Sequence, residues 1–528
     1  MQLYLGFIML TGSGESPAFG QITNSQVQQY ILSNKSDIAE QVQLFYLELN
    51  YQTAWIQHEN NFNQRVLFQA LNSASDFGLR KQDYHHSLVE SIQENTISLN
   101  TKSDSLAVEV KITEAALNYF RDLAYGNVKP VFGYNGLAYT PDCHNIPVLL
   151  ADHVSRNCLS MLRNRITPPL PEIGVIEQRI AGINAVLRDS SFDEVTISSK
   201  KVSSKNRALV LKLFQLGIVE SPHVSLPDLV LIEKVKEVQR QFNLMADGVL
   251  RTTILQELNI PLRARLQQLS LAINYYRWLN CLTQSQSVIV VNVPAAYMKV
   301  YSRDKVILEM KMVVGKRSTP TPTLASKVTE VILYPYWHVP RSIATKELLP
   351  ILKRFPGYID EGNYQVLNKA GKIMDPYAIN WHALSSTNFP YLLRQSTGCD
   401  NALGLLKLSF YSPFGVYLHD TPIKSSFMLK KRYFSHGCMR MEKPFDLGHL
   451  VLKNNRIAIG TLEQKGCLRN QAPITVPAAE HMAVIVWYNP VGIDSSGRVL
   501  FFEDIYEKFD LSGKKQRLER GNLNQAAE

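Results

Sequence analysis

The sequence predicts a multi-domain α+β protein in which helices precede a mainly antiparallel β-sandwich. The chain has 528 residues, which is too long for one hydrophobic core and indicates roughly three or four domains. Apolar residues recur at three-to-four spacing through residues 25–227, which predicts a helical scaffold domain. From residue 287 onward, β-branched runs alternate with turns, which predicts hairpins and therefore an antiparallel sheet.

The composition is that of an ordinary folded protein, with 45% hydrophobic and 19% charged residues. The net charge of +10 favours polyanionic partners. Basic residues are scattered and form no nucleic-acid motif, so nucleic acid is not an expected partner. Anionic cell-envelope polymers or membrane head groups fit the charge equally well, and no cofactor motif is present.

Six cysteines lie far apart and form no C-x-x-C pair, which excludes both a dense disulfide scaffold and a zinc ribbon. They are Cys143, Cys158, Cys281, Cys399, Cys438 and Cys467. Cys438 alone has neighbours that suggest chemistry. We expect the other five to be buried small hydrophobes, although a disulfide between Cys143 and Cys158 is an open alternative.

Residues 1–24 contain a short apolar stretch, residues 3–10, ahead of small residues. This pattern is typical of a signal peptide, but a basic segment before the apolar core is missing. The segment is therefore either a signal remnant or an N-terminal segment that stays with the chain. No apolar run in the sequence approaches the roughly 18 residues that span a bilayer.

Three smaller regions follow the helical scaffold in order. Residues 228–262 predict two short helices around the turn Asp247-Gly248, where glycine supplies the unusual backbone angle. Residues 263–286 predict a linker helix. Residues 287–500 predict the β-rich domain, and residues 501–528 a charged tail.

The predicted strands of the β-rich domain occur in two groups. They are residues 288–293, 297–301 and 306–315, then 405–410, 415–418 and 482–488. Residues 346–395 interrupt the strands and open with a helical stretch, which indicates an insertion. Pro444 suits a first helical turn, so Cys438 is expected on a loop between a strand and a helix.

The segment Ser435-His436-Gly437-Cys438 has the residues that a thiolate acyl-transfer enzyme needs. A thiolate is the nucleophile, and a histidine in reach can remove the thiol proton and return it to a leaving amine. His436 lies two residues from Cys438, which in an extended loop places both on one side. Gly437 leaves room for a substrate carbonyl, and the Gly437 and Cys438 amides could face a developing oxyanion.

Two further polar residues have open roles. His419 ends a predicted strand and is either a second active-site group or a structural histidine. Arg440 could hold a substrate carboxylate or pair with Glu442. A zinc site formed by His419, His436 and Cys438 is disfavoured because the one-residue separation of His436 and Cys438 strains tetrahedral geometry.

The pattern H-x15-S-H-G-C-x-R, from His419 to Arg440, resembles the signature of YkuD-type L,D-transpeptidases, which act on peptidoglycan. Most of the chain resembles the large multi-domain branch typified by YcbB. Residues 115–130 are similar to its scaffold, 235–259 to a peptidoglycan-binding module, and 346–395 to its capping subdomain. Residues 337–344 and 401–404 resemble segments that flank its catalytic site.

The resemblance implies roles for individual residues. Cys438 would be the acylated nucleophile, His436 its general base and Gly437 part of the active-site backbone. The implied substrate-binding residues are Trp337, Tyr417, His419, Ser435 and Arg440. Smaller members carry Asn where Arg440 stands, and the branch usually has Pro where Thr397 stands, so the role of position 440 is the less certain.

The implied reaction releases terminal D-Ala from a stem peptide and forms a 3-3 cross-link through a cysteinyl thioester. Water as acceptor would make the protein an L,D-carboxypeptidase, and a protein amine would attach that protein to the wall. A wall-binding scaffold without activity is the non-enzyme alternative. Expected partners are stem peptides, glycan strands and other cell-wall synthesis proteins. The expected location is the periplasm or cell envelope, with membrane association only through an N-terminal signal or anchor.

Overall fold

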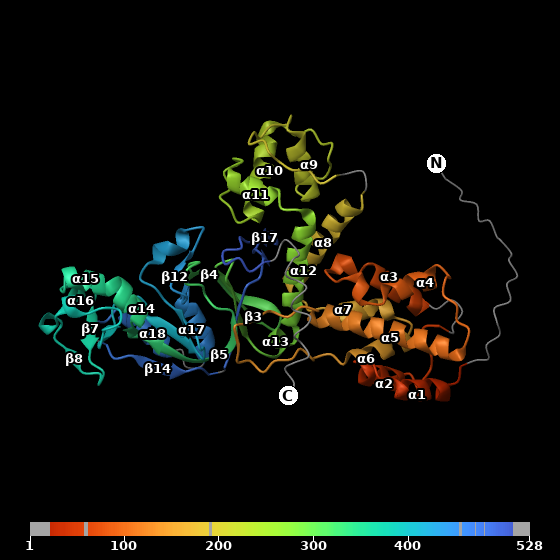
Figure 1. Ribbon diagram of the computed structural model, residues 1–528, viewed down its shortest axis with the longest axis horizontal. Coiled ribbons are helices and arrows are strands. Elements are labelled where there is room, and N and C mark those ends of the chain that lie inside the picture. The colour runs from red at the N-terminus through yellow and green to blue at the C-terminus, as the bar shows by residue number, and fades with distance from the viewer. Residues whose placement is uncertain are drawn as a thin grey trace. The chain divides into compact units, whose positions relative to one another are not determined.

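The computed structural model describes residues 22–56, 62–189, 193–453, 457–469, 471–479 and 481–509 (Figure 1). Most of the predicted segment 1–24 and the tail beyond residue 509 therefore lie outside the described residues. The chain divides into two compact units. Unit 1 contains residues 1–75, Leu79–Ala124 and His144–Thr167, and unit 2 contains Asp76–Gly78, Tyr125–Cys143 and residues 168–528.

Unit 1 is helical, as the apolar spacing predicts. Its helices are α1 (Asn24–Ser33), α2 (Ala39–Glu48), α3 (Phe62–Asn72), α4 (His86–Gln93), α5 (Lys102–Tyr125), α6 (Ile146–Ser155) and α7 (Leu162–Ile166). Glu109 of α5 is fully buried and accepts backbone hydrogen bonds from Trp55 at 3.1 Å and Ile56 at 3.0 Å. These bonds satisfy a carboxyl group whose pKa burial raises, and they tie the segment before α3 to α5.

The helices of unit 2 begin earlier than the predicted domain boundary at residue 227. They are α8 (Pro171–Arg188), α9 (Arg207–Gln215), α10 (Asp228–Gln241), α11 (Thr252–Leu258), α12 (Leu262–Trp278) and α13 (Asn280–Ser285). Helix α8 packs along α12. Between α10 and α11, Gly248 has φ +78° and donates its N–H to Gln239 Oε1 at 2.8 Å. The predicted helical hairpin forms, while its binding to peptidoglycan stays a prediction.

The main sheet of unit 2 has the strand order β1-β5-β10-β11-β13-β4-β3-β2-β15, and β15 also pairs with β5, so the ladder closes on itself. The strands are β1 (Tyr134–Asn135), β2 (Val288–Asn292), β3 (Tyr297–Ser302), β4 (Lys305–Gly315), β5 (Leu324–Leu333), β10 (Leu406–Phe410), β11 (Leu418–His419), β12 (Tyr433–Ser435), β13 (Met439–Met441), β14 (Ile474–Pro477) and β15 (Ala483–Trp487).

The sheet is mixed: most neighbouring strands pair antiparallel, and the others pair parallel, which the hairpin signals do not predict. Hairpin-connected neighbours such as β2–β3 and β3–β4 are antiparallel, but β11–β13 and β2–β15 are parallel. A parallel pair needs a crossover of a dozen or more residues, and the segment between His419 and Met439 supplies one. Turn signals predict hairpins well but do not show where a long loop returns.

Two hydrophobic cores lie on opposite faces of the sheet. Val288 and Val290 of β2 pack into a core shared with α8 and α12, while Ile289 and Val291 pack into the core enclosed by the closed ladder. Successive side chains point to opposite faces, so β2 is apolar on both. The remaining elements are β16 (Val491–Ile493), β17 (Val499–Phe501), α17 (Pro444–Leu452) and α18 (Ile457–Lys465).

The predicted insertion forms a separate layer with its own core around Leu352 and Trp381. Its strands follow the order β6-β9-β7-β8. The elements are β6 (Trp337–His338), α14 (Arg341–Ile343), the π-helical segment η4 (Ala344–Leu348), α15 (Leu349–Arg354), α16 (Tyr358–Glu361), β7 (Tyr364–Leu367), β8 (Ile373–Met374) and β9 (Leu392–Gln395). The layer thus starts before residue 346, at β6. We call residues 337–395 the cap.

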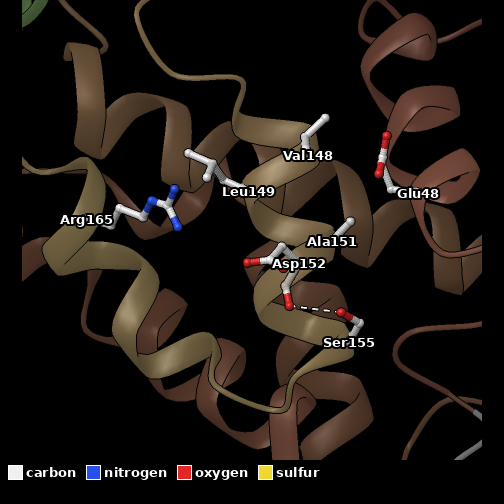
Figure 2. Close-up of a pocket in the computed structure, with 7 residues that line it drawn as sticks. All are labelled: Glu48, Val148, Leu149, Ala151, Asp152, Ser155 and Arg165. Atoms are coloured by element: carbon white, nitrogen blue, oxygen red, sulfur yellow. Dashed lines mark hydrogen bonds between the residues drawn. The ribbon is translucent and has the colours of Figure 1, made fainter.

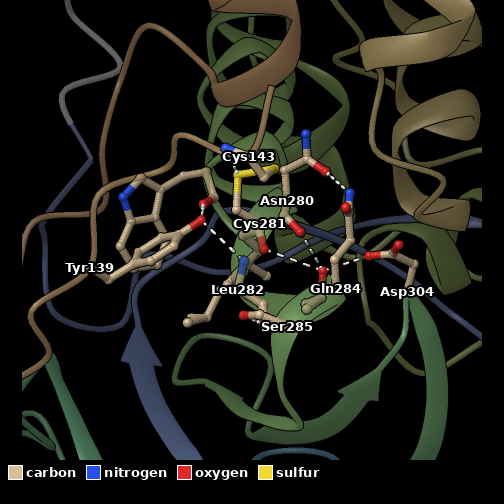
Figure 3. The surroundings of a disulfide bond; sticks show 11 residues. Tyr139, Cys143, Asn280, Cys281, Leu282, Gln284, Ser285 and Asp304 are labelled. Atoms are coloured by element: carbon tan, nitrogen blue, oxygen red, sulfur yellow. Dashed lines mark hydrogen bonds between the residues drawn. A yellow bond between two sulfur atoms is a disulfide. The ribbon is translucent and has the colours of Figure 1, made fainter. Parts of the chain in front are cut away.

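Four cysteines form disulfides, Cys143–Cys281 and Cys399–Cys467, so the expectation of five buried unpaired cysteines is wrong. Figure 3 shows the first of these at the start of α13, beside Asn280 and Leu282. Cys158, the open partner proposed for Cys143, is unpaired. The sequence separations of 138 and 68 residues explain why spacing alone could not pair them. No helix among the described residues has the length and apolarity to cross a membrane.

A buried ion cluster joins α8 to the sheet and supports a stability prediction. Glu172 is fully buried and accepts hydrogen bonds from Lys299 Nζ at 2.8 Å and the Tyr301 hydroxyl at 2.7 Å. Lys299→Met would leave a buried carboxylate without its cation, so we expect a loss of about 3–5 kcal/mol in the free energy of unfolding. Urea denaturation measures this loss. Exposed Lys305→Met is the control, and an equal loss in both variants would contradict the prediction.

Candidate active site

Three neighbouring strands, β10, β11 and β13, bring the predicted site residues together. Leu408, Leu418 and Met439 are Cα partners in these strands and all lie in the enclosed core. Because side chains alternate across a strand, their sequence neighbours lie on the opposite face. That face carries Lys407, Tyr417, His419, Cys438 and Arg440. Lys407 and Arg440 are the Cα partners of His419 on its two sides.

Cys438 is one of two free cysteines and lies half-buried on this face. Burial raises the pKa of its thiol, while the backbone N–H and hydroxyl of Tyr417 and the charges of Lys407 and Arg440 oppose that rise. The raised pKa keeps the thiol protonated at neutral pH. A nearby base must therefore take the proton before the sulfur can attack.

The loop before Cys438 is held by internal hydrogen bonds. Ser435 Oγ donates to the Cys438 carbonyl at 2.6 Å and accepts from the Gly437 N–H at 3.1 Å. Thr321 Oγ1 donates to the Gly437 carbonyl at 2.8 Å. Ser435 is thus a buried part of the loop frame, and the expected use of the Gly437 amide for an oxyanion is not available. Gly437 has φ +115°, which side chains disfavour.

His436 points to the cap. Its Nε2 lies 2.7 Å from Glu347 Oε1 in η4, and about a third of its side chain is exposed. Within the described ranges, His436 makes no hydrogen bond with Cys438. The expected contact between His436 and the thiol is therefore not formed.

His419 is buried and has a defined tautomer. Its Nδ1 lies 2.5 Å from the Asp420 carbonyl, which can only accept, so Nδ1 carries the proton and Nε2 is left as a base. Burial lowers the pKa of His419 to about 3, and the charge of Arg440 adds to this effect. His419 is thus a neutral imidazole on the same face as the thiol.

Tyr417 connects the thiol to the cap. Its hydroxyl contacts both Cys438 and the Trp337 indole, and burial raises its pKa so that it stays protonated. Lys407 Nζ lies 4.2 Å from the centre of the Tyr417 ring. Lys407 is absent from the residues predicted for the site. The signal was available, because it is the polar position between two buried leucines of a predicted strand.

Residues 286–459 match the YkuD family, described as the L,D-transpeptidase catalytic domain, and residues 40–172 match the Scaffold domain family. Residues 286–459 are therefore similar to L,D-transpeptidase catalytic domains of the YkuD family. The YkuD match spans strands β2 to β13 with the cap and both histidine motifs, while β1, β14 and β15 of the sheet lie outside it. The Scaffold match covers most of the helices of unit 1.

A Haemophilus influenzae protein named, by inference, as an L,D-transpeptidase is 35% identical over 237 residues. The match covers 45% of this chain and 47% of that protein, so the chain spans about half the length of the relative. The structure of an L,D-transpeptidase from Mycobacterium smegmatis is 14% identical to this chain, with a TM-score of 0.19. The matched region is 38% of this chain and 58% of that one. The structure of the Ldtfm–avibactam carbamoyl enzyme is 16% identical to this chain, with a TM-score of 0.18. The matched region is 38% of this chain and 49% of that one. At these scores the two structures add nothing to the assignment.

Arg440 of the YkuD domain does not pair with Glu442. Glu442 instead accepts the Lys311 backbone N–H at 3.0 Å and lies 3.5 Å from Lys311 Nζ. The Arg440 Nε is buried and has no hydrogen-bond partner in the described part of the chain. The open alternative of a structural pair is therefore wrong, and the guanidinium remains available on the face that carries Cys438.

Two hollows lie away from these residues. One, of about 320 Å³, is in unit 1, where the Ser155 hydroxyl donates to the Asp152 carbonyl at 2.9 Å (Figure 2). Its lining residues are Glu48, Val148, Leu149, Ala151, Asp152, Ser155 and Arg165. The other, of about 450 Å³, lies between β4 and α17. Neither contains a cysteine. No group of three or more metal-binding side chains converges among the described residues.

The neutral state of His419 predicts a pH effect on stability. The folded pKa of about 3 lies below the ordinary value of roughly 6.5, so only the unfolded chain binds this proton as the pH falls. The resulting contribution is fully present above the ordinary value and decreases as the pH falls toward 3. We expect the wild type to lose on the order of 2 kcal/mol more than His419→Asn between neutral pH and about pH 4.5.

Urea denaturation at the two pH values measures this difference. His436→Asn is the matched control because that side chain is partly exposed. Equal acid sensitivity of His419→Asn and the wild type would show that His419 is not held neutral.

Proposed function

We propose that the protein is a peptidoglycan L,D-transpeptidase that acts through a cysteinyl thioester and forms 3-3 cross-links. The supporting observation is that the region matching the YkuD family carries, on one face of the sheet, the Cys438 thiol and the His419 imidazole, whose Nε2 is free to accept a proton. This combination supplies a nucleophile and a base. The half-length coverage of the relative leaves the activity of the whole chain as a proposal.

In the first half-reaction, His419 Nε2 takes the thiol proton as Cys438 Sγ attacks the carbonyl that joins the diamino acid to terminal D-Ala. The C–S bond forms and the C–N bond breaks. The proton passes from His419 to the departing amine. The Tyr417 hydroxyl stays protonated beside the sulfur and is placed to donate to the developing oxyanion.

In the second half-reaction, an acceptor amine from a neighbouring stem attacks the thioester. His419 Nε2 removes the amine proton, the new amide bond forms, and the proton returns to Cys438 sulfur. The same imidazole thus serves as base and acid in both directions.

His436 is the other candidate base, expected both from its two-residue spacing to Cys438 and from the family resemblance. Its Nε2 is engaged by Glu347, and its ring is more exposed than that of His419. We therefore propose a different role for His436, which is to link the active-site loop to the cap. Glu347 comes from the insertion and reaches the loop through this contact.

We propose an exported location in the periplasm or cell envelope. The two disulfides are typical of oxidising compartments, and the net charge of +10 suits an anionic wall. The α10–α11 hairpin, residues 228–262, would bind peptidoglycan and raise the local substrate concentration. Interactions with other cell-wall synthesis proteins belong to this proposal as well.

Muropeptide analysis of sacculi incubated with the purified full chain tests the function. New 3-3 linked dimers, absent with Cys438→Ala, are expected. Tripeptide products without dimers would make the protein an L,D-carboxypeptidase, and protein-linked muropeptides would make it an attachment enzyme. Binding to sacculi with no change in muropeptides would leave only the non-enzyme scaffold.

A further inference from the structure

Two cations stand beside the thiol without an acidic partner. Lys407 and Arg440 are half-buried on the same sheet face as Cys438, and each is a Cα partner of His419. In the described part of the chain neither forms an ion pair, and the Arg440 Nε has no hydrogen-bond partner. Glu330 of β5 is the carboxylate that acts on Lys407, from beyond ion-pair distance.

Partial burial of these two charged side chains costs desolvation free energy, and no ion pair among the described residues offsets that cost. Burial lowers the pKa of both Lys407 and Arg440, which means that desolvation disfavours their charged forms. By contrast, buried Arg265 of unit 2 pairs with Glu257 at 2.7 Å, and buried Arg432 is satisfied by backbone carbonyls. A buried cation without a partner is expected where an anion binds.

The cap adds a further cation near this location, Arg394, while its Glu347 is engaged by the active-site loop. His338 of β6 is influenced electrostatically by Lys407 and Arg394. Arg394 itself donates through Nε to Gln365 Oε1 at 2.9 Å, which is an uncharged partner. The acid of the cap that reaches the active-site loop, Glu347, is engaged by His436.

We propose that Lys407 and Arg440 form a carboxylate-binding subsite beside Cys438 that selects donor stems with a free carboxylate. The inference rests on the proposed function. A donor stem carries a carboxylate on the departing D-Ala, and a second one near the scissile carbonyl where the diamino acid has a side-chain carboxylate. Both offer the same chemistry to a guanidinium and an ammonium.

The competing explanation is that both cations only stabilise the thiolate, since their charges lower the pKa of Cys438. That role would affect every donor equally, whatever its carboxylates. A carboxylate subsite affects only donors that carry the bound carboxylate. The two roles are therefore separated by a matched donor series.

The test uses the full chain and three tetrapeptide donors: one with both carboxylates free, one with a C-terminal carboxamide, and one with a side-chain carboxamide. Loss of the bound carboxylate is expected to raise KM roughly tenfold or more, the size of a charged hydrogen bond. The donor that shows this rise identifies which carboxylate is bound. Lys407→Met and Arg440→Gln should raise KM by a similar factor for the donor with both carboxylates free. For the carboxamide donor whose KM is already raised with the wild type, the same substitutions should raise KM little further.

Lys407→Arg should restore most of the affinity, because the charge returns. Lys327 is an exposed lysine of β5, and Lys327→Met should leave KM unchanged for all three donors. Equal effects of Lys407→Met on all three donors would overturn the subsite and leave thiolate stabilisation. Equal KM values for all three donors with the wild type would overturn it as well.

Calorimetric titration of the three donors into Cys438→Ala separates this inference from the proposed function. If the wild type converts no donor but the variant binds the free donor roughly tenfold more tightly than one carboxamide, the function fails and the subsite holds. If the wild type converts donors but Cys438→Ala binds all three equally, the function holds and the subsite fails.

Discussion

Cys438→Ala is expected to abolish formation of any acyl-enzyme, with transfer activity reduced by roughly 10⁴-fold or more. The thiol is the proposed nucleophile on the face that carries His419. Alanine removes the attacking atom and leaves the loop hydrogen bonds of Ser435 in place, because those use the Cys438 carbonyl and the Gly437 N–H. Intact-mass spectrometry after exposure to a carbapenem measures the acylation directly. The wild type should gain the mass of one inhibitor molecule.

Cys158→Ala is the matched control. Cys158 is the other free cysteine and lies in unit 1, outside the YkuD domain. This variant should acylate at the wild-type rate. An adduct that persists in Cys438→Ala, or one that disappears in Cys158→Ala, would contradict the assignment of the nucleophile.

Much of the site could be predicted because strand alternation is a local property. The polar position of Lys407 between Leu406 and Leu408, and of Cys438 beside Met439, follows from the two-residue period alone. The identity of the neighbouring strands does not. The parallel pairing of β11 with β13 depends on where the segment after His419 returns, and nothing in its composition specifies that.

The expected contact between His436 and Cys438 failed for a specific reason. It assumed an extended loop, in which residues two apart project to one side. Gly437 has φ +115°, so the chain between the two residues is not extended. The actual partner, Glu347, lies 89 residues earlier in the insertion, a separation beyond any local pattern.

The cysteines show the same limit. Cys399 lies between β9, the last strand of the cap, and β10, and Cys467 lies between α18 and β14. The two cysteines meet because both segments lead back into the main sheet. Helix periodicity and turn residues describe elements, while disulfides and active sites depend on how elements assemble. The sequence does predict the cap as an insertion, because the strand pattern stops before it and resumes after it.

His419→Asn is expected to lower the rate of Cys438 acylation by roughly 10²–10⁴-fold, the usual contribution of a general base. Asparagine retains a donor near the position of Nδ1 for the Asp420 carbonyl, so the variant removes the base at Nε2 while disturbing the site little. Because burial raises the thiol pKa, acylation without this base depends on the small thiolate fraction. Time-resolved mass spectrometry with a carbapenem measures the rate.

The pH dependence separates His419 from His436. In His419→Asn the residual rate should rise about tenfold per pH unit toward alkaline pH, since hydroxide must supply the thiolate that the imidazole no longer generates. His436→Asn and Glu347→Gln break only the link to the cap, so each should change acylation by less than about tenfold and keep the wild-type pH profile. The reverse pattern, with the larger loss and the altered profile in His436→Asn, would assign the base to His436. In that case the Glu347 contact would have to open before catalysis, and Glu347→Gln should then accelerate acylation.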